Sequence, residues 1–100
     1  MAKLLQIDFP FQGPFGEQMT EAMRELAVSI NDEPGFISKI STENAEQGEA
    51  GGIYLFKSEE TAQSYLEKHS ARLKEFGVDN INAKIFDVNE PLSKINKSLG

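Results

Sequence analysis

The chain contains no cysteine, only one histidine and ten cationic side chains against sixteen anionic ones. Without cysteine it can form no disulfide, use no thiolate nucleophile and hold no thiolate-ligated metal. A single histidine also argues against a protein-bound transition metal. The sequence carries no G-x-x-x-x-G-K or H-E-x-x-H signature, and no G-x-G-x-x-G after a predicted strand. We therefore expect no metal and no cofactor.

The charge balance and the lack of long apolar runs exclude further classes of partner. The formal charge is −6 at pH 7, and the lysines and arginines are scattered, whereas nucleic acid requires a concentrated positive face. No run approaches the ~20 apolar residues of a membrane span. Gln6 and Asp8 interrupt the apolar start that a signal peptide would need. We expect no nucleic-acid partner, no membrane partner and a cytoplasmic location.

Apolar periodicity predicts a β-α-β unit in the first half of the chain. Residues 3–11 alternate at period two and predict a strand, and residues 17–31 carry an apolar stripe at helical spacing. A second strand is expected at about 36–43, with Phe36 and Ile40 on one face.

The second half repeats this plan after a polar, glycine-bearing hairpin loop at 44–50. Residues 51–56 are apolar on both faces and predict a central strand. Ser58 is a candidate N-cap for a helix that ends before Gly77. A fourth strand near 81–88 precedes a break at Pro91 and a short polar tail.

This order predicts a ferredoxin-like βαββαβ fold of the α+β class, with all 100 residues in one domain. Its four-stranded antiparallel sheet would carry both helices on one face. The other face would still expose apolar side chains such as Ile53 and Leu55, and each would forfeit roughly 1.5–3 kcal/mol if left in water. We therefore expect a homodimer packed sheet to sheet. The alternative is a monomer whose open face is made partly polar by Gln6, Asp8, Lys39 and Ser41.

His69 is the sharpest candidate for chemistry. It falls on the apolar side of the second predicted helix, between Leu66 and Leu73, and should point toward the sheet. Histidine titrates near neutrality, so it could take a proton from a phenol or hydrogen-bond the resulting oxyanion. The alternative is a buried histidine satisfied by a backbone carbonyl or by a carboxylate such as Asp87.

Aromatic residues are candidates for an apolar ligand pocket around His69. Tyr65 lies one helical turn before it, and Tyr54 lies on the predicted central strand; both are also ordinary core tyrosines. Asp8 and Asn31 are weaker candidates. An aromatic wall, which can equally be core, would consist of Phe9, Phe11, Phe36, Phe56 and Phe86.

Short stretches spread over nearly the whole chain carry a family resemblance. They are Leu4-Leu5-Gln6, Phe11-Gln12-Gly13-Pro14-Phe15-Gly16, Ser29-Ile30-Asn31, Glu33-Pro34-Gly35-Phe36, residues 49–56 (EAGGIYLF), Tyr65-Leu66-Glu67-Lys68-His69, Ala71-Arg72-Leu73 and residues 86–93 (FDVNEPLS). In this order and at this spacing, the chain resembles the YdhR-type putative mono-oxygenases of the dimeric α+β barrel superfamily. The second predicted strand departs from the pattern, because Ser38 and Ser41 stand where relatives tend to carry aromatic residues.

The resemblance implies the dimer and a cofactor-independent mono-oxygenase acting on an aromatic or phenolic small molecule. His69 would be the catalytic base or oxyanion partner. The residues expected to bind the substrate are Tyr54, Tyr65, Phe9, Phe36, Ser38, Ile40 and Phe56. The alternative is a dimer that binds a small apolar molecule, or simply assembles, without turnover.

Overall fold

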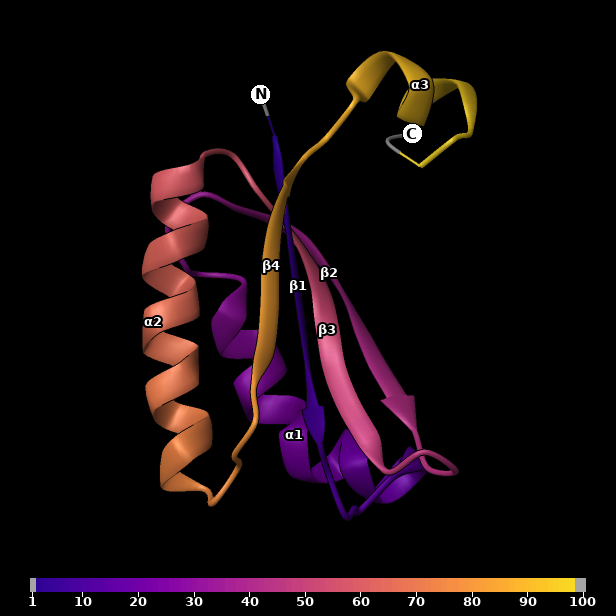
Figure 1. Cartoon of the computed structure of the whole chain (residues 1–100), viewed down its shortest axis with the longest axis vertical. Helices are drawn as coiled ribbons and strands as arrows, with labels where there is room; N and C mark the ends of the chain where they lie inside the picture. The colour runs from indigo at the N-terminus through magenta and orange to yellow at the C-terminus, as the bar shows by residue number, and fades with distance from the viewer. Residues whose placement is uncertain (1, 99–100) are drawn as a thin grey trace.

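The computed structural model describes residues 2–98, so residues 1, 99 and 100 of the predicted domain lie outside the described residues. The elements are β1 (Lys3–Pro10), α1 (Gly16–Ile30), β2 (Phe36–Asn44), β3 (Glu49–Phe56), α2 (Glu59–Glu75), β4 (Asn82–Asp87) and α3 (Glu90–Ile95) (Figure 1). This order confirms the predicted βαββαβ plan and adds a short C-terminal helix. None of these helices is long and apolar enough to cross a membrane.

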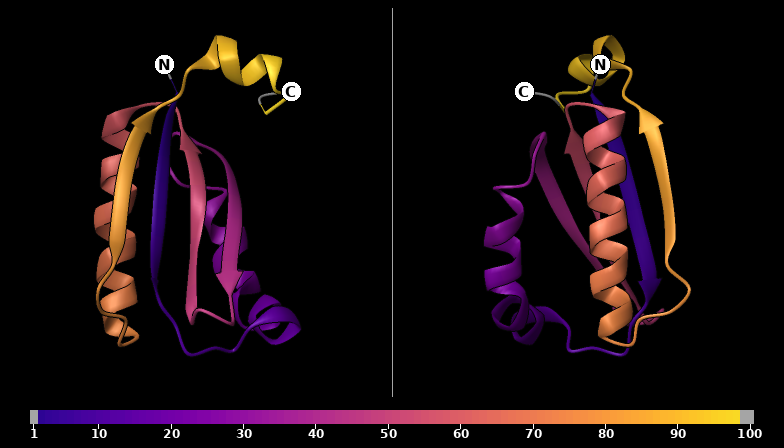
Figure 2. Two further views of the ribbon diagram at one scale, coloured as in Figure 1. Left: turned by 45° about the vertical axis from the view of Figure 1, so that its right-hand side comes forward. Right: turned by 90° about the vertical axis from the view of Figure 1, so that its left-hand side faces the viewer.

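Within the described residues the strands form one antiparallel four-stranded sheet in the order β2-β3-β1-β4. Strand β3 is therefore central, as its apolar composition predicted. Helices α1 and α2 lie on the same side of the sheet (Figure 2). We call this side the covered face and the opposite side the open face.

The core lies between α2 and the covered face. Leu5, Ile7 and Phe9 alternate inward along β1, and Tyr54 and Phe56 do so along the paired strand β3. All five are buried, with at most 8% of the side chain exposed. Burial of each such side chain stabilises the fold by about 1.5–3 kcal/mol, which fixes the register of the two central strands.

Both ends of α2 are capped as the sequence predicted. The Ser58 hydroxyl oxygen accepts a hydrogen bond from the Thr61 amide at 3.2 Å, which satisfies one of the free amides of the first turn. Gly77 has φ +85° just beyond the helix, a conformation that costs a side-chain-bearing residue more than glycine. Thus α2 keeps a fixed orientation on the sheet, which matters because it carries His69.

Helix α1 is less buried than its apolar stripe predicts. Only Ile30 is fully buried along it, whereas Met23 and Leu26 are half-buried. The helix lies on the β2 side of the sheet and apart from α2, which contacts β1, β3 and β4 (Figure 2). At its start, the Gly16 amide donates to a Glu43 carboxylate oxygen at 2.9 Å. The end of α1 borders a groove against β2 instead of closing a dense core there.

A β-bulge near the start of β2 changes which residues share a face. Phe36 pairs with Phe56, whereas Ile40 pairs with Ile53. The prediction that Phe36 and Ile40 share a face is wrong, because the extra residue of the bulge shifts the alternation by one. Phe36 lies on the covered face, and Ile40 lies on the open face with Ser38.

Helix α3 replaces the predicted polar tail. Pro91 lies in its first turn, where a residue without an amide hydrogen is tolerated, so the expected break at Pro91 is wrong. The Asn89 side-chain oxygen accepts from the Leu92 amide at 3.1 Å and caps the helix. Leu92 and Ile95 are 59% and 74% exposed, and the helix projects beyond the end of the sheet (Figure 1).

Candidate active site

Five of the predicted site residues form one aromatic cluster on the covered face. Tyr54 and Phe56 alternate inward on β3, while Tyr65 and His69 lie one turn apart on α2 and share its inner side. The Tyr65 ring centroid is 5.3 Å from that of His69, in a stacked arrangement, and 5.2 Å from that of Tyr54. Phe56 lies 5.4 Å from Tyr65, and Phe36 lies 5.9 Å from Phe56. These contacts hold the imidazole rigidly against the sheet.

His69 is a buried, neutral imidazole. Only 5% of the residue is exposed, and its Nδ1 lies 3.1 Å from Nη2 of Arg72. Since a guanidinium only donates, Nδ1 must accept and Nε2 must carry the hydrogen. Burial, followed by the charges of Arg72 and Lys39, lowers the pKa of His69 to about 4. At neutral pH the ring is therefore a weak base and a good hydrogen-bond donor.

The carboxylate partner considered for His69 is wrong. The Asp87 carboxylate is 68% exposed and bonds to the Lys3 ammonium at the end of β1. These two residues are paired across the β1–β4 ladder. The partner of His69 is instead cationic, which changes the chemistry expected of it.

Two cations face the cluster. Arg72 was not among the predicted site residues, and the predicted placement of Lys39 on the open face is wrong. Lys39 lies on the covered face of β2 with Nζ 5.0 Å from the Tyr54 ring centroid. Arg72 lies three residues after His69 on α2. Neither cation belongs to an ion pair of the described residues, which are Lys3–Asp87, Arg24–Glu21 and Lys68–Glu33. The sequence did contain a signal for Arg72, because it follows His69 at the i,i+3 spacing that brings helical side chains together.

Buried polar atoms without partners also lie in the cluster. The Tyr65 hydroxyl and Arg72 Nε are buried and have no partner at full hydrogen-bond geometry among the described residues, although Tyr54 and Arg72 lie near enough to the Tyr65 hydroxyl to act on its pKa. Burial is the largest cause that raises the pKa of Tyr65 and of Tyr54, so both phenols stay protonated at neutral pH. An unpaired buried donor costs about 1–3 kcal/mol, which a bound acceptor would offset.

A groove lies beside this cluster, between α1 and β2. We call it the α1–β2 groove; it has a volume of about 270 Å³. Its lining residues are Ala27, Ile30, Asn31, Phe36, Ile37, Ser38, Lys39 and Ser41. Phe36 and Lys39 belong to both the groove and the cluster, because Phe36 contacts Phe56 and Lys39 lies over Tyr54. A ligand in the groove would therefore meet the aromatic rings and a cation.

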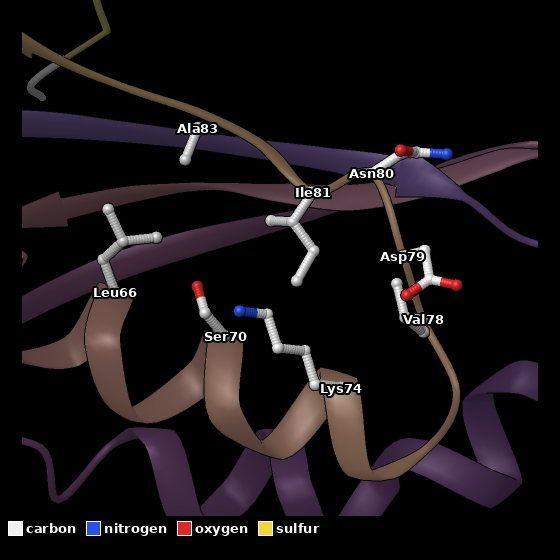
Figure 3. A pocket seen from close by; sticks show the side chains of 8 residues that line it. All are labelled: Leu66, Ser70, Lys74, Val78, Asp79, Asn80, Ile81 and Ala83. Atoms are coloured by element: carbon white, nitrogen blue, oxygen red, sulfur yellow. The ribbon is translucent and has the colours of Figure 1, made fainter.

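A second cavity, of about 280 Å³, lies on the other flank of α2, facing β4. Figure 3 shows Leu66 and Ser70 of α2 opposite Ile81 and Ala83. None of the predicted site residues lines it, and its lining contains no histidine or tyrosine. We regard it as a packing defect beside the α2–β4 contact and not as the candidate site.

The remaining predicted residues lie outside the cluster. Phe9 is buried near the far end of β1, where it pairs with Ala50. Ser38 is one of the residues that line the groove. Ile40 is 66% exposed on the open face, so it does not lie between sheet and helices as expected. The bulge in β2 is the reason for the position of Ile40. Asp8 accepts from Asn82 Nδ2 at 3.3 Å across the open face.

Two further candidate residues, Asn31 and Phe86, lie in different parts of the structure. Asn31 lines the groove. Phe86 is 46% exposed on the open face and cannot join the aromatic wall. Among the described residues, no group of three or more histidine, aspartate or glutamate side chains is arranged to hold a metal ion.

Comparison with known proteins identifies a family. The family described as "Putative mono-oxygenase ydhR" matches residues 4–99. No curated protein matches the chain.

Several solved structures share the fold. The cofactor-independent oxygenase SnoaB from Streptomyces nogalater superposes with a TM-score of 0.62 at 13% identity, over 88% of this chain and 93% of that one. The monooxygenase from the gene ActVA-Orf6 of Streptomyces coelicolor, in complex with nanaomycin D, gives 0.60 at 19% identity over 88% of each chain. A protein of Deinococcus radiodurans described as a "putative antibiotic biosynthesis monooxygenase" gives a TM-score of 0.56 at 12% identity, over 89% of this chain and 93% of that one. At these identities the likeness establishes the fold alone.

Proposed function

Because the chain belongs to the ydhR family of putative mono-oxygenases, we propose that it oxygenates an aromatic, phenolic small molecule without metal or cofactor. The observation that carries the proposal is a buried neutral imidazole beside two cations and an aromatic cluster, which shares Phe36 and Lys39 with the lining of a groove. Two structural neighbours support it, since one is a cofactor-independent oxygenase and another is a monooxygenase in complex with nanaomycin D.

The first step is ionisation of the substrate hydroxyl. The charges of Arg72 and Lys39 favour the phenolate over the phenol, because opposite charges within about 4–6 Å lower the pKa of an acid by about 1–3 units. With its pKa of about 4, His69 cannot retain the proton, which leaves through the groove to solvent. The Nε2–H of His69 donates to the oxyanion.

The electron-rich anion is itself the reductant of oxygen. Transfer of one electron to O₂ gives superoxide and a substrate radical, and their combination forms a carbon–oxygen bond in a hydroperoxide. Protonation and cleavage of the O–O bond release water and leave a carbonyl on the ring, so one phenolic substrate and O₂ give one quinone and water. The hydroxyls of Tyr54 and Tyr65, which stay protonated, would hold the substrate oxygens in this apolar site.

Oxygen uptake tests the proposal. Purified protein is incubated with hydroquinones and anthrone-like compounds, and oxygen consumption is compared between the parent, His69→Ala and Ser70→Ala, whose side chain lies in the other cavity. We expect His69→Ala to lower the rate about 10²–10³-fold, as for loss of one oxyanion donor, and Ser70→Ala to leave it unchanged. Equal rates in all three proteins would remove His69 from the mechanism.

The low pKa of His69 also supports a second candidate function, which is binding without turnover. A site that lacks a strong base could sequester an apolar molecule unchanged. Native mass spectrometry of the protein incubated with ligand in air separates the two functions. A retained ligand of unaltered mass supports binding, and a product heavier by one oxygen and lighter by two hydrogens supports oxygenation.

We also propose that the whole chain is one domain that works as a homodimer through the open face. This face carries Leu4, Ile53 and Leu55, all half-buried in one chain, and the more exposed Ile40 and Phe86. An apolar surface of this kind is an association surface in soluble proteins. The two-fold arrangement would leave both grooves facing away from the shared sheets.

A further inference from the structure

The charges around the aromatic cluster do not balance. Lys39 and Arg72 both approach it, and neither has an anionic partner in the described part of the chain. This local excess of positive charge occurs in a chain whose formal charge is −6 at pH 7. A half-buried pair of like charges is costly unless an anion lies between them.

Arg72 is at the centre of this group. Its charge acts on the pKa of Lys39, Tyr54, Tyr65 and His69. These residues come from β2, β3 and α2, so the cationic site is formed where three elements meet. It is not a solvated stripe along one helix.

Two donors in the same place lack acceptors. The Tyr65 hydroxyl, of a residue only 2% exposed, and Arg72 Nε have no partner at full hydrogen-bond geometry among the described residues, although Tyr54 and Arg72 lie near enough to the hydroxyl to act on its pKa. The nearest carboxylate with an influence on Tyr65 is that of Glu33. It is paired with Lys68, from whose Nζ it accepts at 2.6 Å, and no hydrogen bond joins it to Tyr65 or Arg72.

We propose that the ligand of this site is an aromatic carboxylate, whose carboxylate group is held by Arg72, Lys39 and the Tyr65 hydroxyl while its ring packs against Phe36 in the α1–β2 groove. This inference rests on the proposed function, because it names the substrate class of the same site. The carboxylate would accept from the guanidinium and the phenol and neutralise both cations. The groove volume of about 270 Å³ lies just below the roughly 300–1,000 Å³ typical of ligand pockets, which suits a small ring system.

Calorimetry with two matched probes tests the proposal. β-Naphthoate and β-naphthamide have the same ring and nearly the same shape, and differ in charge. We expect the parent to bind β-naphthoate about tenfold more tightly or better, as charge-assisted hydrogen bonds predict. Arg72→Gln and Lys39→Gln should each reduce this preference, whereas Lys74→Gln, a cation in the other cavity, should keep it.

Neither probe carries a hydroxyl that can be oxidised, so the result is independent of whether oxygen uptake is found. Lys39 and Arg72 lie on different elements, so misfolding of one variant, detected by circular dichroism, leaves the other as the test. Equal affinities for the two probes, including no measurable binding of either, would overturn the proposal. So would a preference that both substitutions leave unchanged.

Discussion

The side chain of His69 combines almost complete burial with a cationic donor on one ring nitrogen. Its position on an apolar helix face, with Tyr65 one turn away, was predictable from helical periodicity. The protonation state was not, because it depends on Arg72 and Lys39, which reach it from α2 and β2. Periodicity places a residue on a face, whereas the charge of its neighbours depends on packing between elements.

The pKa of His69 has a consequence for stability. Its folded value of about 4 lies below the ordinary 6.5, so between these values the unfolded chain binds a proton that the folded chain does not. Stability from this group is present above the ordinary value and is lost as the pH falls toward about 4. We expect a loss of up to about 3 kcal/mol over this interval.

Urea unfolding at several pH values measures this loss, with His69→Gln as the variant that should show a weaker pH dependence. Since the chain has one histidine, nuclear magnetic resonance also reports the titration of that ring without ambiguity. A measured pKa near the ordinary 6.5 would contradict the account of a buried imidazole beside two cations.

Tyr65→Phe separates stability from binding. The substitution removes a buried hydroxyl that has no partner, so we expect the free energy of unfolding to stay constant or to rise by up to about 1 kcal/mol. Binding of β-naphthoate should weaken by about threefold to tenfold, since the hydroxyl is a proposed donor. Chemical denaturation and calorimetry give the two values. A clear loss of stability would instead mean that the hydroxyl is hydrogen-bonded in the folded protein.

Among the secondary-structure elements, those with strong periodicity or cap signals matched their predictions, and the exceptions have physical causes. Ser58 and Gly77 bound α2 as expected. The bulge in β2 moved Ile40 and Ser38 to the open face, and a bulge leaves no simple mark in an alternating sequence. Helix α3 was missed because Pro91 was interpreted as a break, although proline also favours a first helical turn.

Substitutions at two glycines test two different features of the fold. Gly51 tests the pairing of β1 with β3, and Gly77 tests the end of α2. A Cβ atom on Gly51 would lie 2.0 Å from the Ile7 carbonyl oxygen, so Gly51→Ala must separate β1 from β3 and should cost about 3 kcal/mol or more. Gly77 has φ +85° and no atom near its Cβ position. Gly77→Ala should therefore cost only the backbone strain, about 1–2 kcal/mol. Denaturant unfolding measures the free energy of unfolding of the two variants. Equal losses of stability would contradict the assigned register of β1 against β3.

At the scale of the whole molecule, the fold leaves one sheet face without helices. The central residue of that face is Leu55, which lies opposite Leu4 on β1 and Ser38 on β2. We expect Leu55→Glu to convert the proposed dimer into monomers, because dimerisation would bury the new charge. Val28→Glu is the control, since Val28 is 61% exposed on α1.

Sedimentation equilibrium gives the mass of each protein. The parent and Val28→Glu should have about twice the chain mass of 11.1 kDa, and Leu55→Glu the chain mass itself. A parent that sediments as a monomer at micromolar concentration would contradict the dimer. The sequence predicted the open face because β3 is apolar on both sides, but it cannot report what covers that face.

The most direct measurement is the pKa of a phenol bound at the site. β-Naphthol is titrated under argon with and without protein, and the absorbance of its anion gives the pKa in each state. The account predicts that the pKa of bound β-naphthol falls by about 1–3 units, and that Arg72→Gln returns it toward the free value. An unchanged pKa, or an equal fall in both proteins, would contradict the claim that this cationic, buried site generates the anion that reacts with oxygen.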